Sequence, residues 1–402
     1  MSVLKILFWT ALFIIFYSYL GYGILLFIII KIRRMLGFSK DKNQQKAYEP
    51  EVTLFVSAYN EKDFVAAKVA NSKSLNYHPE KVKYVWVTDG SDDGTPELLK
   101  QHEGIEVYHE AARNGKIAAM NRGMHFVTTP LVIFSDANTN LGKDSIREIV
   151  KLFSNPKVGC VSGEKRIYAK EADSAAGAGE GMYWKYESQL KKWDAELYSV
   201  VGAAGELFAI RTELWQDVEK DTLLDDFVIS LRVAMAGYTI QYNPNAYAIE
   251  TASANVKEEL KRKIRISAGG IQSVVRLRSL LNVFKYGTLS FQYISHRVLR
   301  WTLTPLLLSL IIPLNLILAI HEGLLQFNMY ALLFWGQLLF YAAALLGWLL
   351  ESKQIRLKVL FIPYYFFIMN LSVYLGFGRY LKGNQSVNWE RAKRGTANTF
   401  SS

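Results

Sequence analysis

The sequence predicts an α/β domain built on a mostly parallel β-sheet, with membrane-spanning helices on both sides of it. Apolar, strand-like runs alternate with helical patterns between residues 50 and 285, and that alternation is typical of βαβ units. Long uncharged stretches flank this region. Several predicted strands end in loops rich in glycine, aspartate and asparagine, where open α/β sheets bind their ligands. The chain of 402 residues, 50% hydrophobic, has room for one such domain and its membrane segments.

The first uncharged stretch covers residues 6–30. As a helix it would be ~37 Å long, which exceeds the ~30 Å thickness of a bilayer hydrocarbon core. A cleaved signal peptide has a shorter apolar core and a small-residue cleavage site, and this stretch has neither. We therefore interpret residues 1–38 as an N-terminal transmembrane anchor.

Three further transmembrane helices are predicted within residues 301–381. The apolar stretches that predict them are 302–320, 329–350 and 359–377. The preceding segment, 284–300, mixes aromatic and basic side chains, which is typical of an amphipathic helix at the membrane interface. A basic tail follows at residues 382–402.

Basic residues beside the spans predict the orientation. Three of them lie within residues 31–34, directly after the first span, whereas Lys5 alone precedes it. The positive-inside rule therefore places residues 39–283 on the cytoplasmic side of a cell membrane, which we expect to be a bacterial plasma membrane crossed several times. Residues 321–328 carry no lysine or arginine and are expected outside. A fourth span would put the tail outside as well, but its basic residues favour the inside, so its side stays open.

The net charge of +11 is a feature that also occurs in nucleic-acid-binding proteins. Many of the basic residues, however, flank the apolar stretches, so membrane lipid head groups and a phosphorylated substrate explain the charge better. We expect no nucleic-acid partner. Cys160 is the one cysteine, which excludes an intramolecular disulfide and a cysteine-rich metal site and fits a reducing compartment.

The elements of the predicted domain follow a polar linker at residues 39–51. Strands are predicted at 51–58, 82–88, 105–109 and 131–135. Helices are predicted at 63–75, 95–102, 115–127 and 143–154. Polar loops follow three of the strands, at Asp89–Thr95, Asn114–Lys116 and Asp136–Asn138. Each loop alone is consistent with a polar turn or a helix N-cap, but side chains at successive strand ends converge on one crevice, so together they predict a ligand site.

Two features of the later sequence each allow two interpretations. Asp225 and Asp226 precede a helical pattern at 227–237, where they are either helix-capping residues or a pair of functional carboxylates. Aromatic side chains crowd residues 180–197, and such rings either fill a core or stack on sugars. They are Tyr183, Trp184, Tyr186 and Trp193.

Taken in order, the motifs of this region resemble those of family-2 glycosyltransferases with the GT-A fold, the nucleotide-diphospho-sugar transferase fold. The matching stretches are Ser57–Glu61, Asp89–Thr95, Asn114–Asn121, Ser135–Asn138, Gly202–Arg211, Leu223–Asp226 and Lys261–Gln272. The resemblance covers about residues 50–280, and together with the spans it is similar to the membrane-embedded hyaluronan, chitin, poly-N-acetylglucosamine and cellulose synthases. It implies a hexosyltransferase that uses a nucleotide sugar, expected to be UDP-linked.

On the donor side, the residues that the resemblance implies for nucleotide-sugar binding are Ala58, Asn60, Glu61, Asp89, Lys116, Asp136 and Arg265. Asp89 would contact the uracil ring, because a carboxylate accepts the hydrogen bond of a base N–H. Lys116, at a helix start after a glycine, suits a phosphate, although an exposed surface lysine would have the same sequence context. Mg²⁺ or Mn²⁺ would be held by Asp136 and Asn138, where the family has Asp-x-Asp and where an amide oxygen still suits the ion.

On the acceptor side, the resemblance implies Gly205, Glu206 and Trp184 as binding residues. Asp226 matches the family's general base, which takes the proton of the acceptor hydroxyl as that oxygen attacks the anomeric carbon. The adjacent Asp225 is a second catalytic carboxylate, whose charge would raise the pKa of Asp226 toward a useful range. Displacement without an enzyme nucleophile inverts the anomeric centre.

The stretch Lys261–Gln272 lies where the membrane synthases carry a Gln-x-x-Arg-Trp motif. Arg265 keeps the arginine, but Arg262 replaces the glutamine and Ile266 replaces the tryptophan. In the family this motif helps to hold the diphosphate and the growing chain near the membrane. The changes leave catalysis in place and put processivity in question. The same run would also suit a basic amphipathic helix on anionic lipid.

The leading hypothesis is an inverting membrane glycosyltransferase that extends a cell-surface or extracellular polysaccharide. Its main alternative adds a single sugar to a lipid-linked acceptor and releases it, which needs every donor motif and no translocation channel. A non-catalytic subunit is disfavoured because the residues expected to carry the chemistry are retained. A transporter is disfavoured because no predicted span carries paired ionisable residues.

Overall fold

The structure is a computed structural model that describes residues 1–38, 48–167, 175–251, 256–352 and 358–383. Two predicted segments, the linker at 39–51 and the basic tail at 382–402, lie largely outside the described residues. The side chain of Tyr183 lies outside them as well.

The described part of the domain contains one eight-stranded sheet, in the order β3-β2-β1-β4-β7-β6-β8-β5. The strands are β1 Val52–Ala58, β2 Val82–Asp89, β3 Ile105–Glu110, β4 Leu131–Asp136, β5 Asn140–Leu141, β6 Val158–Ile167, β7 Leu207–Arg211 and β8 Thr239–Glu250. The four predicted strands are β1 to β4, and they pair in parallel. Strand β7 runs antiparallel to both β4 and β6, and β5 runs antiparallel to β8, whereas β6 and β8 pair in parallel. The sheet is therefore mixed, with parallel pairs in both halves.

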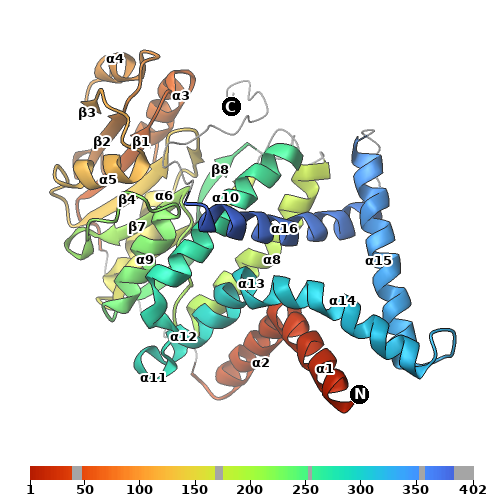
Figure 1. Cartoon of the computed structure of the whole chain (residues 1–402). Coiled ribbons are helices and arrows are strands. Elements are labelled where there is room, and N and C mark those ends of the chain that lie inside the picture. Colours follow the sequence, from red (N-terminus) through yellow and green to blue (C-terminus); the bar gives the residue numbers. More distant parts are fainter. Residues whose placement is uncertain (39–47, 168–174, 252–255, 353–357, 384–402) are drawn as a thin grey trace.

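Helices cover both faces of this sheet (Figure 1). They are α3 Lys62–Lys73, α4 Thr95–Lys100, α5 Lys116–Met124, α6 Ser145–Val150, α8 Ala175–Leu197, α9 Asp225–Met235 and α10 Val256–Arg276. Short 3₁₀ turns occur at Pro79–Lys81, Lys151–Ser154, Thr212–Leu214 and Arg278–Leu281.

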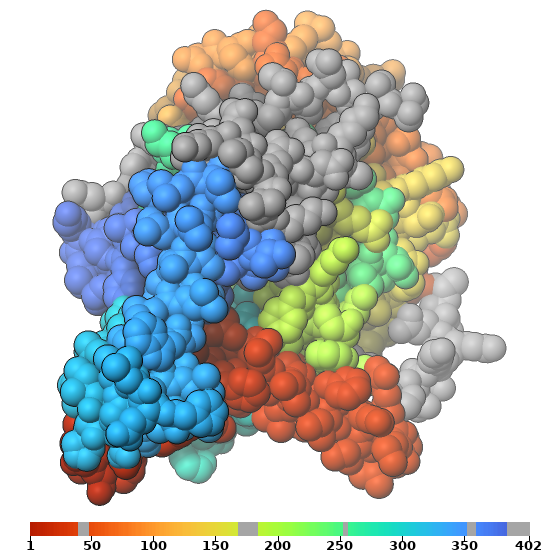
Figure 2. Space-filling model, turned by 90° about the vertical axis from the view of Figure 1, so that its right-hand side faces the viewer, coloured from red at the N-terminus to blue at the C-terminus, as the bar shows by residue number. Residues whose placement is uncertain are grey.

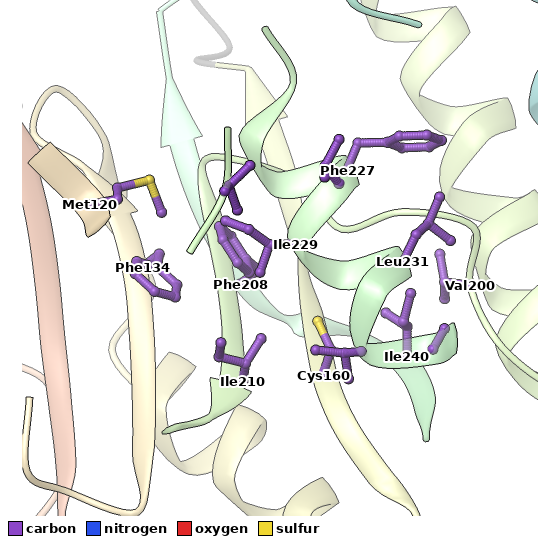
Figure 3. Close-up of a cluster of buried hydrophobic side chains, with 14 of the residues drawn as sticks. Met120, Phe134, Cys160, Val200, Phe208, Ile210, Phe227, Ile229, Leu231 and Ile240 are labelled. Carbon is purple, nitrogen blue, oxygen red and sulfur yellow. The ribbon is translucent and has the colours of Figure 1, made fainter. Parts of the chain in front are cut away.

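The core consists of two apolar clusters, one on each face of the sheet. Successive residues of a strand face opposite sides, so Val132 and Phe134 enter one cluster and Leu131 and Ile133 enter the other. Figure 3 shows the first cluster, where side chains of α5 and α9 meet those of the central strands. Burial on both faces explains why β4 is a continuous apolar run in the sequence.

The first membrane helix consists of α1 Ser2–Phe16, a π-helical turn Tyr17–Gly21 and α2 Tyr22–Met35. Together they form a candidate span of 34 residues. Figure 1 shows α1 and α2 meeting at an angle, and a π-turn is a known cause of such a kink. Helix α2 packs on α8 of the domain, and the Tyr186 hydroxyl of α8 donates to the carbonyl of Tyr19 in the π-turn at 2.6 Å. Figure 2 shows this helix beside α8.

The other candidate spans are α14 Leu303–Glu322, α15 Met329–Ser352 and α16 Lys358–Leu381. Each coincides with a predicted apolar stretch. Helix α14 returns to the start of the chain, where Glu322 forms an ion pair with Lys5 at 2.7 Å. Helix α16 lies along α10 of the domain (Figure 1).

The segment 284–300, predicted as one interfacial helix, is instead interrupted at Gly287, after which residues 288–301 are helical with a π-turn inside. The elements are α11 Val283–Tyr286, α12 Thr288–Tyr293, the π-turn Ile294–Val298 and α13 Leu299–Trp301. Gln292 and His296 are buried because both find acceptors on α8, where Asp194 takes a hydrogen bond from each. These contacts join the domain to the membrane helices.

Candidate functional site

The parallel half of the sheet ends in two adjoining pockets. Strands β1, β2 and β4 end at Ala58, Asp89 and Asp136 and are neighbours in the sheet, so the loops that follow them converge. The first pocket is lined by Ser57, Ala58, Tyr59, Glu61, Asp89, Arg113, Gly115, Lys116, Ala119, Asp136, Ala137 and Asn138. The second pocket shares Lys116 and Asp136 with it and extends toward α8, α10 and α13.

Asp89 is a buried carboxylate that fixes the loop before α5. Its Oδ2 accepts hydrogen bonds from the backbone N–H groups of Asn114 at 2.7 Å and Gly115 at 2.6 Å. Gly115 has φ +92°, in the left-handed region that favours glycine, and this turn starts the helix at Lys116. Asp89 therefore holds Lys116 in position while it lines the first pocket, and its predicted contact with a uracil ring stays a prediction.

The loop after β1 is tied to the Asp89–Thr95 loop. The Asn60 side chain and Asp92 exchange two hydrogen bonds, at 2.8 and 3.0 Å, and Ser91 accepts from the Asn60 backbone. Glu61 lines the first pocket, whereas Asn60 is directed at the neighbouring loop. Of these two predicted donor residues, Glu61 is thus the one that faces the pocket.

Lys116 connects the two pockets through ion pairs. Its Nζ lies 3.0 Å from Oδ1 of Asp136 and 3.2 Å from Oδ2 of Asp225. Burial alone would lower the pKa of Lys116, but the charges of Asp136 and Asp225 outweigh burial and raise it. The lysine is therefore a fixed cation and not the exposed surface residue that the sequence also allowed.

Behind Asp136 lies a second buried lysine that the sequence did not single out. Lys68 of α3 donates to Ser135 Oγ at 2.7 Å and to the carbonyl of Thr139 at 2.9 Å, on either side of the Asp136–Asn138 stretch. Burial lowers the pKa of Lys68 to about 7, although the charge of Asp136 acts against that shift. Lys68 thus orders the turn that carries the predicted metal ligands.

Asp226 lines the second pocket. It lies in the first turn of α9, whose N-cap residue is Leu224, and no side chain makes a capping hydrogen bond there. Burial, together with the charge of Asp225, raises the pKa of Asp226 to about 7, against the opposing charge of Lys116. A Cβ atom at Gly205 would lie 3.2 Å from Oδ2 of Asp226, so the absence of a side chain at Gly205 leaves room beside this carboxylate.

The second pocket also contains a buried network of ion pairs around Lys165. Lys165 of β6 lies 2.6 Å from Glu206 Oε1 and also pairs with Glu250 of β8. The Lys165 ammonium stands over the ring of Trp184 at 5.5 Å. The predicted acceptor-side residues Gly205, Glu206 and Trp184 therefore line one pocket together with Asp226.

Helix α10 completes this pocket with Arg262, Arg265 and Ile266. The alternative interpretation, a basic amphipathic helix on anionic lipid, does not hold for residues Ser267–Val274 of α10. These residues are buried between the domain and α16. Arg265, predicted as a donor-side residue, thus lines the pocket that contains Asp226 and does not line the first pocket. Its predicted contact with the diphosphate stays a prediction.

The residues at Asp136 fit a divalent cation. Asp136 supplies a carboxylate and Asn138 an amide oxygen, and both line the first pocket. In the described ranges no cluster of three or more acidic, histidine or cysteine side chains could hold a metal by itself. A cation at this place would complete its coordination with oxygens of a phosphate-bearing ligand.

Sequence reasoning missed several side chains that line the pockets. The Arg113 guanidinium stacks over the Tyr59 ring at 3.8 Å in the first pocket. Arg297, from the segment predicted to lie on the membrane, and Trp301, directly after that segment, reach the second pocket. Arg113 directly precedes the Asn114–Lys116 motif, so its place in the pocket could have been predicted from that motif. The positions of Arg297 and Trp301 could not, because they depend on how the chain folds back onto the domain.

Comparisons with known proteins agree with this architecture. The family described as "Glycosyltransferase like family 2" matches residues 50–269. Poly-beta-1,6-N-acetyl-D-glucosamine synthase of Staphylococcus aureus (strain MSSA476) is 26% identical over 235 residues, which are 56% of this chain and 56% of that protein. The synthase of the same name from Staphylococcus epidermidis is 24% identical over 284 residues, 69% of this chain and 67% of that protein.

Among solved structures, the mannosyltransferase PcManGT from Pyrobaculum calidifontis, in complex with GDP-Man and Mn2+, superposes with a TM-score of 0.69. It is 21% identical and covers 94% of this chain and 99% of that one, which shows a shared GT-A fold. The chain spans about half the length of the first curated relatives that it matches. With the family matched over more than half of its residues, the protein is a glycosyltransferase that belongs to family 2.

Proposed function

We propose that this protein is an inverting membrane glycosyltransferase, which moves a sugar from a nucleotide sugar, expected to be UDP-linked, to a growing cell-surface polysaccharide. One observation carries the proposal. The first pocket, with its Asp136–Asn138 pair, shares Lys116 and Asp136 with the second pocket, which holds a carboxylate of raised pKa at Asp226. A donor and an acceptor can therefore meet at this junction.

The nucleotide fits the first pocket. Arg113 stacked on Tyr59 offers a flat surface for a base or ribose, and Asp89 lies beside them. Lys116 offers a positive charge to the diphosphate. Arg265 would contribute a second positive charge from α10.

A divalent metal held by Asp136 and Asn138 would neutralise charge on the departing diphosphate. The solved structure of PcManGT contains Mn2+, which is consistent with Mn²⁺ or Mg²⁺ here. The buried carboxylates favour this role, because the three acids Asp136, Asp225 and Asp226 face two cations, Lys116 and Arg265.

Asp226 would act as the general base. A carboxylate with a pKa near 7 is half ionised at neutral pH and accepts a proton from a sugar hydroxyl more readily than an ordinary aspartate would. The attacking oxygen approaches from the second pocket, opposite the leaving diphosphate, and direct displacement inverts the anomeric carbon.

A second candidate is transfer of one sugar to a lipid-linked acceptor. The specific observation in its favour is the altered motif on α10, where Arg262 and Ile266 stand in the second pocket in place of glutamine and tryptophan. Both candidates would operate at the cytoplasmic face of a membrane that the four apolar helices cross.

The test is to incubate the purified full-length protein in lipid with a panel of labelled nucleotide sugars and Mn²⁺, and then to size the products. High polymer would support the first candidate and lipid-soluble single additions the second. Absence of any sugar transfer from every donor would contradict the proposed function.

A further inference from the structure

Lys191 of α8 is a buried lysine in the second pocket that the proposed chemistry does not use. It lines the pocket, and only 3% of its surface is exposed. Trp184 and Glu187 precede it at helical spacing and line the pocket as well, so one face of α8 carries all three side chains. The Lys191 ammonium lies 5.6 Å from the centre of the Trp184 ring and 5.8 Å from that of Tyr242.

Within the described part of the chain, the Lys191 ammonium makes no hydrogen bond and no ion pair. A buried lysine without such a partner is unusual, because removing an ammonium from water is costly. Burial lowers the pKa of Lys191, although the charge of Glu187 acts against that shift. The hydrogen-bonding capacity of this ammonium is therefore left to a ligand of the pocket.

The carboxylates around Lys191 are already bound to other groups. Three of them act on the charge of its ammonium. Their partners are Ser188 and Tyr242 for Glu164, His296 and Arg297 for Glu187, and Lys165 for Glu206. A carboxylate that turned toward Lys191 would have to release one of these partners.

The other lysines that line the second pocket are paired. Their partners are Asp136 and Asp225 for Lys116, Glu206 and Glu250 for Lys165, and Glu259 for Lys263. These lysines balance acids of the protein. Lys191 differs from them, because it lies in the same pocket without an ion-pair partner among the described residues.

An ammonium in this position suits an oxygen that only accepts hydrogen bonds. Carboxylate and carbonyl oxygens are of this kind, whereas a hydroxyl group also brings a proton for which the occupied carboxylates nearby offer less. A hydrogen bond from a charged donor is also stronger than one between neutral groups. Trp184, beside the ammonium, offers an aromatic surface to a sugar ring.

We infer that Lys191 determines which acceptor the second pocket takes, by donating a hydrogen bond to a carboxylate or carbonyl oxygen on the terminal sugar of the acceptor. A uronic acid supplies the first kind of oxygen and an N-acetylated sugar the second. The inference rests on the proposed function and names the acceptor class for it. Lys191 is a specificity-determining residue, and the proton transfer stays with Asp226.

The first test measures binding, so that it does not depend on the donor. The full-length protein in detergent is titrated by calorimetry, with UDP and Mn²⁺ present, with three short oligosaccharides. One ends in glucose, one in N-acetylglucosamine and one in glucuronic acid. We expect the second or the third to bind more tightly than the first by about tenfold or more, the effect of one charge-assisted hydrogen bond. The tighter of the two identifies the amide carbonyl or the carboxylate as the ligand.

Lys191→Met keeps the length of the side chain and removes the ammonium, so it should abolish this preference. Lys192→Met is the matched control, because Lys192 is the next residue of the same helix and is exposed. It should keep the preference. Equal binding of all three probes to the natural protein, no binding of any of them, or a preference that survives in Lys191→Met would overturn the inference. Loss of the preference in both variants would also overturn it.

Thermal stability separates a ligand-binding lysine from a structural one. Lys191→Met should melt at the same temperature as Lys192→Met or higher, because the substitution removes a charge that burial disfavours. A clearly lower melting temperature would show that the ammonium holds the fold and would overturn the assignment.

The inference and the proposed function can fail separately. Sugar transfer that continues while the three probes bind equally would remove Lys191 as a specificity residue and leave the proposed function standing. A binding preference that depends on Lys191, without transfer from any nucleotide sugar, would support the saccharide site and contradict the proposed function.

Discussion

Lys116 is the residue on which the charge balance of the site depends. Its ammonium lies between Asp136 and Asp225, and Asp226 is close enough to act on its pKa. The Arg265 guanidinium is a second cation that acts on all three carboxylates, so three acids face two cations. Burial, together with the charge of Asp225, raises the pKa of Asp226 and keeps this carboxyl protonated at acid pH.

A pH profile should reveal this. Asp226 must be ionised to accept a proton, and burial with the charge of Asp225 raises its pKa from 3.8 to about 7. We expect kcat to rise with pH through a midpoint at or somewhat below about 7, since a bound metal would add positive charge nearby. Asp225→Asn removes the neighbouring charge and should shift the midpoint to lower pH. A midpoint that does not move would show that the rise reports another group.

The metal prediction concerns Asp136 and Asn138. Turnover should require Mn²⁺ or Mg²⁺ and stop with excess chelator, and Asp136→Ala should lose metal-dependent nucleotide binding. Asn138→Asp adds a negative charge to the ligand set and should tighten Mn²⁺ binding, measured by calorimetry. Full activity in the presence of chelator would exclude the metal-assisted route.

Much of the site was predictable residue by residue, because its motifs lie at the ends of strands that neighbour one another in the sheet. Asp89, Lys116, Asp136 and Asp226 were named from the sequence and meet in two joined pockets. Lys68 could not be named, because nothing local distinguishes a helical lysine that is buried from one in water. The extra role of Asp89 as a clamp on the α5 loop also depends on contacts across 25 or more residues.

At the scale of elements, α10 is the helix that links the catalytic domain to the membrane. One side carries Arg265 into the second pocket, and the other contacts α16 at Gly376. Small residues allow such close helix contact in a membrane protein. The positions of the pocket arginines therefore depend on a helix pair that the sequence analysis did not foresee.

Gly376→Leu should separate this pair. A Cβ atom at Gly376 would already lie 2.7 Å from Ser267 Cβ and 2.8 Å from the Ala268 nitrogen. We expect a lower melting temperature in detergent, corresponding to an overpacking cost of about 1–3 kcal/mol. Gly378→Leu, two residues further on and facing open space, is the control and should be neutral. Equal melting temperatures for both variants would mean that α16 is not held against α10.

The strands β1 to β4 were correctly predicted, but the antiparallel pairing of β7 with its two neighbours was not. Strand β7 lies between β4 and β6 in the sheet but is far from both in the sequence. Its position therefore depends on long-range pairing. Its apolar run Leu207–Ile210 is too short for periodicity to distinguish a strand from a buried helix turn.

For the whole molecule, length and hydropathy identified the four candidate spans, while their packing could not be deduced. Apolar helices gain little from hydrophobicity in lipid, so close contacts such as Gly23 with Tyr186 decide where they rest. The first membrane helix is attached to the domain in two ways. Helix α2 packs on α8, and buried polar groups form hydrogen bonds around His296.

Orientation is the prediction at this scale. Basic residues at 31–34 follow the first span, so a reporter inserted after Asn43 should be detected in the cytoplasm. A second reporter after Ser402 would locate the tail. An external signal at Asn43 would place the two pockets on the side without nucleotide sugars and would contradict the proposed function.

The central claim is that Asp226 accepts the proton of the acceptor, whereas the first pocket binds the donor. The most direct measurement determines donor affinity by calorimetry and sugar transfer by product counting for the same variants. Asp226→Asn should bind the donor normally and lose about 10²–10⁴-fold or more in transfer. Asp89→Ala should weaken donor binding, because the loop that carries Lys116 is released. Near wild-type transfer by Asp226→Asn, with loss in Asp225→Asn, would assign the base to the neighbouring carboxylate, and activity in both would contradict the mechanism.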